Sequence, residues 1–254
     1  MVRLPETGRV KTRLAQAIGA AAACRFYEAC VRDLVVQSAS WPCRVVWAVA
    51  PEGEDEGPAS VSVTPGSGAR VRGRVSGRPA LSVVQRFAER FAVAPEACLE
   101  QQGRDLGQRL ETTLDRLRAA GAVCCLAVGS DLPHLPVAAL ARAIRRLAAH
   151  DLVLGPTRDG GYYLIGLSRP AALFTDIAWS TPSVYPQTLA RARACGLRIA
   201  PPLAFDFDID EARDLEALRR RVARDAELRQ RLPATARVLA ALPPPSSRGA
   251  GPAR

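Results

Sequence analysis

The stretch Ala122-Val123-Cys124-Cys125-Leu126-Ala127-Val128, followed by Gly129-Ser130-Asp131-Leu132-Pro133, decides the fold class of this chain. The apolar run has the length of a buried strand, and a helical pattern follows it over residues 137–149. Asp131 therefore falls at the carboxyl end of a strand, where open α/β sheets place their ligand crevice. Pro133 prevents an immediate helix and holds this turn open.

Strands and helices alternate outward from this stretch. We expect helices over residues 12–38, 81–91, 105–120, 137–149, 181–195 and 211–232. We expect strands over residues 45–49, 122–128, 151–154, 162–167 and 197–200. This alternation predicts an α/β fold with three α/β/α layers and a mostly parallel sheet.

The chain is predicted to form one domain over residues 1–241. Its 254 residues, of which 48% are hydrophobic, are enough for one core of ordinary size. Residues 51–79 are rich in Pro, Gly, Ser and charge, which predicts a long loop or insertion. The Pro- and Ser-rich residues 242–254 predict a disordered tail.

Composition narrows the class of protein. No apolar run approaches the roughly 18 residues of a membrane span and no signal stretch opens the chain, so we expect a cytoplasmic protein. The net charge of +10 comes from arginines spread over nearly every predicted helix, which argues against a nucleic-acid partner. The seven cysteines contain no Cys-x-x-Cys pair, so buried free thiols are expected instead of a zinc or thioredoxin-like site.

Lys11 is the only lysine in the chain. In an arginine-rich composition, a retained lysine indicates a need for a compact ammonium that a planar guanidinium cannot replace. Gly8, Thr12 and Arg13 surround it at the start of a predicted helix, which suggests phosphate binding by backbone amides and two cations. A solvated lysine at a helix start is the alternative. A P-loop is excluded, because Val10 stands where its second glycine is required.

Two further motifs offer polar groups to the same crevice. Asp159-Gly160-Gly161 precedes Tyr162, and its glycines permit left-handed backbone and close approach of a ligand; an ordinary hairpin turn is the alternative. Trp179-Ser180-Thr181 offers a stacking surface and an N-cap ahead of a helix beginning at Pro182.

Carboxylates dominate a third motif, in which Asp206, Asp208 and Asp210 alternate on an extended segment. Alternation places the three acids on one face, where a cation or basic groups must balance them. Asp208 is the expected metal ligand together with Asp131, because Mg²⁺ and Mn²⁺ prefer hard oxygen ligands. Asp210 either joins them or caps the helix that begins at Glu211. His134 is expected to be a surface or packing residue.

In order along residues 3–220, these motifs resemble one family of bacterial proteins. The stretches that carry the resemblance are Pro5-x-x-Gly8-x-Val10-Lys11-Thr12-Arg13-Leu14, Gln102-Gly103-Arg104-Asp105-Leu106-Gly107-Gln108-Arg109-Leu110, Gly129-Ser130-Asp131-x-Pro133, Leu154-Gly155-Pro156-x-x-Asp159-Gly160-Gly161-Tyr162-Tyr163, Trp179-Ser180-Thr181 and Asp208-Ile209-Asp210-x-x-x-Asp214-Leu215. The family was long of unknown function and is described as GT-A-type glycosyltransferases, some linked to arsenosugar biosynthesis.

The resemblance implies a GT-A, nucleotide-diphospho-sugar transferase fold, related to guanylyltransferases of molybdenum-cofactor and coenzyme F420 synthesis. It implies that loop 8–13 binds nucleotide phosphates and that Asp131 and Asp208 hold Mg²⁺ or Mn²⁺. It makes Asp159 the best candidate for acting on the acceptor or the sugar, beside Asp131 as a catalytic acid. One departure is visible: the family begins with an apolar strand of the form Leu-x-x-Phe-x-Lys, which is missing before Met1-Val2-Arg3. We expect neighbouring strands to be left unpaired, and a start codon placed too late.

The expected activity is transfer from a nucleoside-diphosphate sugar to a small-molecule acceptor, with a divalent cation on the leaving diphosphate. A nucleotidyltransferase of the same fold would join a nucleoside triphosphate to a phosphorylated small molecule. A non-catalytic nucleotide-binding or scaffold protein is the third alternative. The sequence leaves the oligomeric state open.

Overall fold

The structure, a computed structural model, describes residues 1–51 and 81–243. The predicted loop at 51–79 and the predicted tail at 242–254 lie almost entirely outside the described residues. Among the described residues, no helix is both long enough and apolar enough to cross a membrane.

Helices make up most of the described secondary structure. They are α1 (Thr12–Ile18), α2 (Ala20–Ser38), α3 (Val83–Phe91), the 3-10 turn η1 (Pro95–Ala97), α4 (Leu106–Ala119), α5 (Val137–Leu147), α6 (Val184–Ala194), α7 (Ala212–Arg224), α8 (Ala226–Arg231) and α9 (Pro233–Ala241). The strands are β1 (Trp47–Val49), β2 (Cys98–Glu100), β3 (Cys125–Val128), β4 (Leu152–Pro156) and β5 (Tyr162–Leu167). Strands and helices follow the predicted order, except that the strand predicted over residues 197–200 is reduced to an isolated bridge at Ile199. The strand predicted over residues 122–128 forms only from Cys125, and the strand predicted over 45–49 forms only from Trp47.

The described strands form two sheets. In the first, β5 lies between β3 and β4 and is antiparallel to both, so β3 and β4 point the same way. Parallel bridges at Leu152–Ile199 and Thr157–Asp206 extend this sheet beyond β4. In the second, β1 and β2 are parallel. The α/β fold class predicted from the sequence is confirmed; the sheet was predicted to be mostly parallel, and β5 runs opposite to its neighbours β3 and β4.

Two helices predicted as continuous are interrupted. The helix expected over residues 12–38 breaks at Gly19, which takes a positive φ of 85° between α1 and α2. The helix expected over residues 211–232 breaks at Asp225, whose carboxylate accepts a hydrogen bond from the Leu228 amide and caps α8. Periodicity alone did not reveal these breaks, because apolar residues continue at helical spacing on both sides of them.

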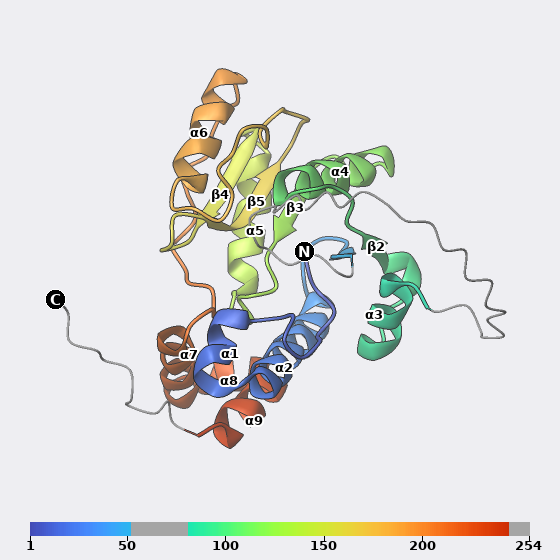
Figure 1. Ribbon diagram of the computed structural model, residues 1–254. Coiled ribbons are helices and arrows are strands. Elements are labelled where there is room, and N and C mark those ends of the chain that lie inside the picture. Colours follow the sequence, from blue (N-terminus) through green and yellow to red (C-terminus); the bar gives the residue numbers. More distant parts are fainter. Residues whose placement is uncertain (52–80, 244–254) are drawn as a thin grey trace, which may run out of the picture.

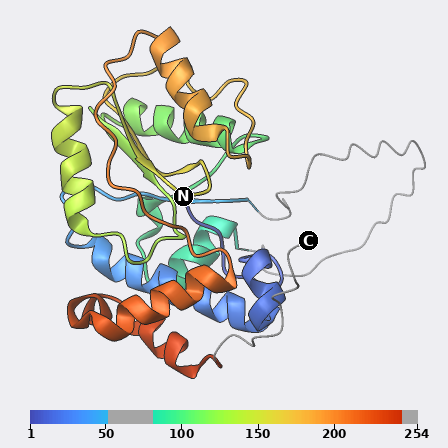
Figure 2. The ribbon, with the colours of Figure 1, turned by 90° about the vertical axis from the view of Figure 1, so that its left-hand side faces the viewer.

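The sheets lie between two groups of helices (Figures 1 and 2). Helices α1, α2 and α7–α9 gather below the strands, and α4 and α6 lie above them. Strands β4 and β5 of the main sheet are almost fully buried: Leu152, Val153 and Leu164 are 0% exposed. The loops that leave β3 and β4 carry the first two acidic motifs.

The prediction of buried free thiols is confirmed for only some of the cysteines. Cys24, Cys30 and Cys125 are buried free thiols, whereas Cys43 and Cys124 are exposed. Cys124 lies directly before β3 and Cys125 begins it, so their opposite exposure follows the alternation expected for adjacent residues of an extended segment.

Candidate functional site

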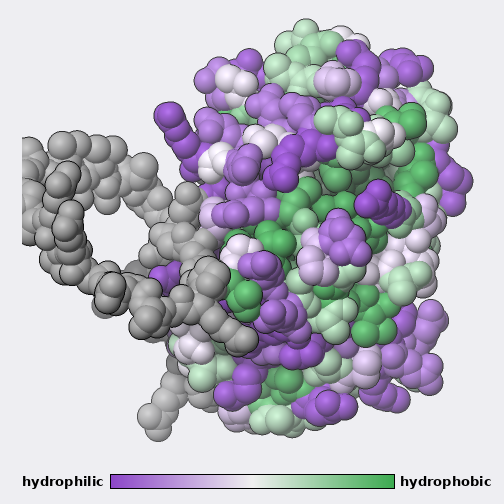
Figure 3. Space-filling model, turned by 90° about the vertical axis from the view of Figure 1, so that its right-hand side faces the viewer, coloured by the Kyte–Doolittle hydropathy of each residue, from purple (hydrophilic) through white to green (hydrophobic). Residues whose placement is uncertain are grey.

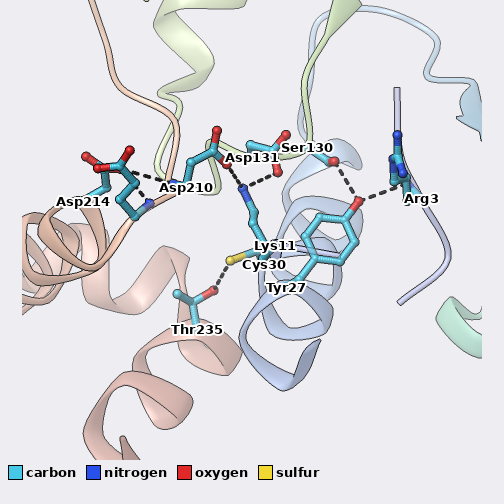
Figure 4. A network of polar contacts seen from close by, with 10 residues as sticks. Arg3, Lys11, Tyr27, Cys30, Ser130, Asp131, Asp210, Asp214 and Thr235 are labelled. Atoms are coloured by element: carbon cyan, nitrogen blue, oxygen red, sulfur yellow. Dashed lines mark hydrogen bonds and ion pairs between the residues drawn. The ribbon is translucent and has the colours of Figure 1, made fainter. Parts of the chain in front are cut away.

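Lys11 occupies the centre of a cluster of carboxylates (Figure 4). It directly precedes α1 in the left-handed conformation, with φ 52° and ψ 45°, and its side chain is only 4% exposed. The ammonium contacts Asp131 and lies 2.8 Å from Asp210 Oδ1. Burial by itself would lower the pKa of Lys11, but the two carboxylates together raise it well above its ordinary value. A solvated lysine, the alternative drawn from the sequence, is therefore wrong.

Asp131 lies in the turn after β3, as predicted. It does not cap α5, because that helix begins at Val137 with Pro136 at its cap position. The backbone oxygen of Asp131 accepts a hydrogen bond from the Ile209 amide at 3.2 Å, which ties the β3 turn to the third acidic motif. The two motifs, far apart in sequence, are thus held side by side.

Asp208 belongs to the same cluster. Burial, followed by the charges of Asp131 and Asp210, raises the pKa of the Asp208 carboxyl to about 8, although Lys11 acts in the opposite direction. The site thus holds more acidic groups than its one ammonium neutralises. Asp210 is a partner of Lys11 and not a helix cap; Glu211 caps α7 instead.

The expectation that Asp206 would join the other two acids is wrong. Its Oδ1 atom lies 2.9 Å from Nε2 of His134 and the side chain also approaches Arg221 at 3.9 Å. His134 is completely buried and packs against the ring of Phe207, with 4.9 Å between centroids. The packing role expected for His134 is confirmed, and its partner explains why Asp206 turns away from Lys11.

Asp159 lies in the connection between β4 and β5, so its motif is also the hairpin turn that the sequence left as an alternative. Its Oδ1 accepts hydrogen bonds from Thr157 Oγ1 at 2.5 Å and from the Gly161 amide at 3.1 Å. The charge of Asp159 also makes the smallest of the contributions to the pKa of Asp208. Asp159 is thus a carboxylate held in the hairpin turn by Thr157 and the Gly161 amide.

The missing side chain of Gly160 permits a close approach, and the group that approaches it is the backbone of Pro182. Its φ is 89°, and a Cβ there would lie 2.2 Å from the backbone oxygen of Pro182. The contact brings the segment before α6 against the hairpin turn.

Trp179, Ser180 and Thr181 lie on the segment before α6. The ring of Trp179 packs over Gly107 of α4, where a Cβ would lie 2.9 Å from it. The Thr181 hydroxyl donates to the Ala178 oxygen at 2.7 Å. The predicted N-cap role is wrong, because α6 begins at Val184 with Ser183 at its cap.

Other predicted site residues lie nearer the margin. Gly8 has a φ of 84° and precedes Lys11 in an exposed turn. Thr12 and Arg13 are exposed on α1. Tyr162 begins β5, and burial raises the pKa of its hydroxyl above the ordinary range.

Sequence patterns did not identify the residues that contact the β3 turn at Ser130, next to Asp131. The Tyr27 hydroxyl on α2 lies 2.9 Å from Ser130 Oγ and accepts a hydrogen bond from the Arg3 amide at 3.0 Å. These contacts join α2 and the N-terminal segment to the β3 turn (Figure 4). Ser130 was visible within its motif, but Tyr27 reads as one more apolar position of a buried helix.

The donor set fits a divalent cation that shares its coordination with a substrate. Asp131 and Asp210 bring hard carboxylate oxygens to the Lys11 ammonium, and burial, followed by the charges of these two acids, raises the pKa of Asp208. Among the described residues, no group of three or more Asp, Glu, His or Cys side chains is placed so that it could hold a metal ion by itself. Two protein carboxylates completed by phosphate oxygens and water would suit Mg²⁺ or Mn²⁺.

Comparisons with known proteins bear on the family and the fold of the chain. Residues 78–181 match the profile of a family described as "Uncharacterized protein conserved in bacteria (DUF2064)". The chain is 31% identical over 140 residues to the 2-phospho-L-lactate guanylyltransferase of Methanopyrus kandleri strain AV19, covering 54% of this chain and 71% of that protein.

A solved structure is similar over nearly the whole chain. It is the crystal structure of a candidate nucleotide-diphospho-sugar transferase from Desulfovibrio desulfuricans G20, with a TM-score of 0.74 and 26% identity. The match covers 94% of this chain and 91% of that one. The resemblance inferred from the motifs is confirmed: the chain belongs to the DUF2064 family of bacterial proteins and has the nucleotide-diphospho-sugar transferase fold.

Proposed function

We propose that this protein is a metal-dependent transferase that takes a nucleoside-diphosphate sugar as donor and a small molecule as acceptor. The observation that carries the proposal is the buried Lys11 ammonium held between Asp131 and Asp210, beside the protonation-prone Asp208. A diphosphate bound with a divalent cation supplies both the anion that Lys11 would contact and the cation that the carboxylates lack. A metal-bound diphosphate would thus pair with both the ammonium and the carboxylates.

Each residue of the cluster has a distinct role in this proposal. Asp131 and Asp208 would hold Mg²⁺ or Mn²⁺, which when bound stabilises negative charge on the leaving diphosphate. Lys11, with loop residues Gly8, Thr12 and Arg13 around it, would bind phosphate oxygens. Lys11 would then exchange part of its contact with Asp131 for the phosphate.

Asp159 is proposed to act on the acceptor. Its carboxylate is oriented by Thr157 and by the Gly161 amide, so one rotamer is favoured before any ligand binds. In that orientation it would accept the proton of an acceptor hydroxyl as the bond to the sugar forms. Gly160, Gly161 and Tyr162, with the segment of Trp179, Ser180 and Thr181, would shape the donor pocket.

A nucleotidyltransferase is the second candidate, and the guanylyltransferase from Methanopyrus kandleri favours it. In that reaction a phosphorylated acceptor attacks the α-phosphorus of a nucleoside triphosphate and pyrophosphate leaves. The same Lys11 and carboxylates would serve, because both reactions develop charge on a diphosphate leaving group. A non-catalytic scaffold is disfavoured, because it needs neither the buried lysine nor the excess of acid around it.

Titration calorimetry in the presence of Mn²⁺ tests the proposal and separates the two reactions. Nucleoside-diphosphate sugars and nucleoside triphosphates would be titrated into the protein and into the Asp131→Asn variant. Saturable binding of a diphosphate sugar, lost in the variant, supports the glycosyltransferase. Binding of a triphosphate alone would replace it with the nucleotidyltransferase. Absence of Mn²⁺-dependent binding for every nucleotide would overturn both.

A further inference from the structure

Arg158 lies in the turn after β4, directly before Asp159, and it has no role in the proposed function. Its side chain is exposed, and its guanidinium carbon lies 5.6 Å from the centroid of the Phe207 ring. Phe207 directly precedes Asp208, the proposed metal ligand. Arg158 thus belongs to the hairpin motif in sequence and contacts the third acidic motif in space.

Backbone pairing brings the Arg158 guanidinium to this ring. Thr157 forms a parallel bridge with Asp206, and the Asp206 amide donates to the Pro156 oxygen at 3.3 Å. Because the two segments run in the same direction, the residues that follow the bridge lie beside each other, which places Arg158 next to Phe207. The contact is therefore built on the bridge that extends the main sheet beyond β4.

The Phe207 ring is itself anchored to the core. It packs against the ring of His134, with 4.9 Å between centroids, and His134 is completely buried. His134 in turn lies 2.9 Å from the Asp206 carboxylate. A cation over the face of an aromatic ring is attracted by the ring quadrupole, so this anchored ring favours one position of the guanidinium.

The positive charge of Arg158 is not neutralised within the part of the chain that the structure describes, where no ion pair joins its side chain to a carboxylate. Asp159 is oriented by Thr157 and the Gly161 amide instead. By contrast, Arg213 pairs with Glu211 at 3.2 Å. An exposed guanidinium presents a planar fork of N–H donors, which matches two oxygens of a carboxylate or a phosphate.

An acidic acceptor would need such a cation. In the proposed function, Lys11 and the metal ion are engaged by the diphosphate of the donor. An acceptor with a negative charge of its own would be repelled by the carboxylates of the site unless a separate cation bound it. Arg158 is placed for that role, because it is the neighbour of Asp159 in the chain and a small acceptor can reach both side chains.

We propose that Arg158 binds an anionic group of the acceptor, a carboxylate or a phosphate, and thereby selects small acids over neutral alcohols. This binding role rests on the proposed function, in which Asp159 takes the proton of the acceptor hydroxyl. The hydroxyl oxygen bonds to the anomeric carbon of the sugar as the bond from this carbon to the diphosphate breaks, and the diphosphate leaves with the electron pair. Arg158 takes no part in these bond changes and determines which acceptor is held beside Asp159.

Calorimetry with three small probes tests this role. Glycerate, glycerol 3-phosphate and glycerol all carry hydroxyl groups and differ in the anionic group that Arg158 would bind. Each probe is titrated in the presence of Mn²⁺ into the original protein and into the variants Arg158→Gln, Arg158→Lys and Arg145→Gln. Arg145, exposed on α5, is the matched control. The nucleotide titrations that test the proposed function are repeated with each variant.

One or both anionic probes should bind saturably, and glycerol should not. Arg158→Gln should weaken this binding at least about tenfold, because a charge-assisted hydrogen bond is lost. Arg158→Lys should retain part of the affinity, because it keeps the charge without the fork. Arg145→Gln should change nothing, and nucleotide binding should be the same in all variants. Preference for glycerate would identify a carboxylate as the bound group, and preference for glycerol 3-phosphate would identify a phosphate.

The titrations separate this proposal from the proposed function. Nucleotide binding without saturable binding of either anion would overturn the role of Arg158 alone, and so would anion binding that Arg158→Gln leaves unchanged. Weaker nucleotide binding by Arg158→Gln would also overturn it, because Arg158 would then belong to the donor site. Absence of nucleotide binding by the original protein would overturn the proposed function, whereas the anion titrations need no nucleotide and still decide whether Arg158 holds an anion.

Chemical labelling of the original protein gives a readout that needs no variant to fold. Phenylglyoxal modifies guanidinium groups, and peptide mass spectrometry measures the rate at Arg158 and at Arg145. Glycerate or glycerol 3-phosphate at saturation should slow the modification of Arg158 relative to Arg145, whereas glycerol should not. Equal rates with and without the anionic probes would overturn the proposal.

Discussion

Strand β3 ends in a polar cluster and borders an apolar slot, a cavity of about 640 Å³ between Val45 and Trp47 on one side and Leu126 and Val128 on the other. In the cluster, Lys11 enters from the start of α1 and contacts Asp131, and Asp210 contacts Lys11 from the segment before α7. Along the slot, the backbone of Met1 and Val2 joins β1 to the end of β3. Charged groups pair with one another in the cluster, whereas mainly apolar side chains line the slot. Hydrophobic residues gather midway across the face of the molecule that Figure 3 shows, between hydrophilic residues above and below.

This comparison shows that electrostatic interactions dominate in the cluster and apolar burial dominates in the slot. The polar cluster contains more acidic groups than its ammonium neutralises, which is consistent with the proposed binding of a cation together with a diphosphate. The slot is bounded mainly by apolar side chains, whose packing contributes to stability through burial. Substitutions in the cluster should therefore change binding most, whereas substitutions along the sheet should change stability alone.

The largest expected effect is on binding. Asp131→Asn should weaken Mn²⁺-dependent nucleotide binding at least about 100-fold, roughly 2.7 kcal/mol, because a carboxylate ligand is lost. The melting temperature should be unchanged or higher, because one like charge leaves the cluster. Calorimetry and thermal melting measure both, with Asp115→Asn on the exposed face of α4 as control. Unfolding of the Asp131 variant would show that the acid is structural and would break the comparison.

Lys11→Met should be the most destabilising substitution in the cluster. It leaves the partly exposed carboxylates of Asp131 and Asp210 without their cation, and the loss of such charged hydrogen bonds typically costs about 1.5–3 kcal/mol of unfolding free energy. Urea unfolding at pH 7.5 measures it, and Arg13→Met, at an exposed position of α1, should lie within about 0.5 kcal/mol of the original protein. Equal stability of the two variants would mean that Lys11 is not the balancing charge.

The sheet offers a matched pair on the apolar side. Ile165→Ala in the fully paired β5, where the side chain is 1% exposed, should cost about 2–5 kcal/mol. Val45→Ala at the slot wall should cost less than about 1 kcal/mol, because its side chain is only partly packed in the absence of a neighbouring strand. Urea unfolding measures both. A cost at Val45 that matches the cost at Ile165 would show that the slot wall is already fully packed.

The last expected effect is a pH dependence of stability. The pKa of Asp208 is about 8 in the folded protein and near 3.9 in an unfolded chain, so the folded state binds more protons between these values. The stability contributed by protonated Asp208 is therefore present below about pH 4 and is lost as the pH rises toward 8. Asp208→Asn should remove this loss. In urea unfolding, the free energy of unfolding of the variant relative to the original protein should be about 1–3 kcal/mol higher at pH 8 than at pH 5.

Asp206→Asn is the matched control for that measurement. Burial acts to raise the pKa of Asp206, but His134 and other partners outweigh it and lower the pKa. Its stabilisation is therefore present at neutral pH and lost as the pH falls, the opposite sign to Asp208. If both variants changed the pH profile in the same direction, the separation of Asp206 from the Lys11 cluster would be wrong.

Local patterns predicted some elements closely. The β5 strand forms over Tyr162–Leu167, as expected from its run of apolar and aromatic residues, because both of its edges are paired. Strands beside the slot are shorter than predicted, because a strand needs a hydrogen-bonded neighbour as well as a suitable sequence. The breaks at Gly19 and Asp225 depend on how helices turn to pack, which periodicity does not contain.

The candidate site was likewise only partly predictable from the sequence. Asp131, Asp208 and Lys11 were visible as residues, since a strand end, an acidic alternation and a lone lysine are properties of the sequence. That Asp210 contacts Lys11 while Asp206 turns to the buried His134 was not visible, because each choice depends on segments about 70 to 200 residues away in the chain.

The sequence by itself determined the α/β class, the acidic motifs at strand ends and the single lysine. The hydrophobic periodicity of strands and helices and the chemistry of each residue are local properties. Only the tertiary structure decided which acids share the ammonium and where β3 lacks a neighbour, because pairing and burial depend on distant segments meeting in space.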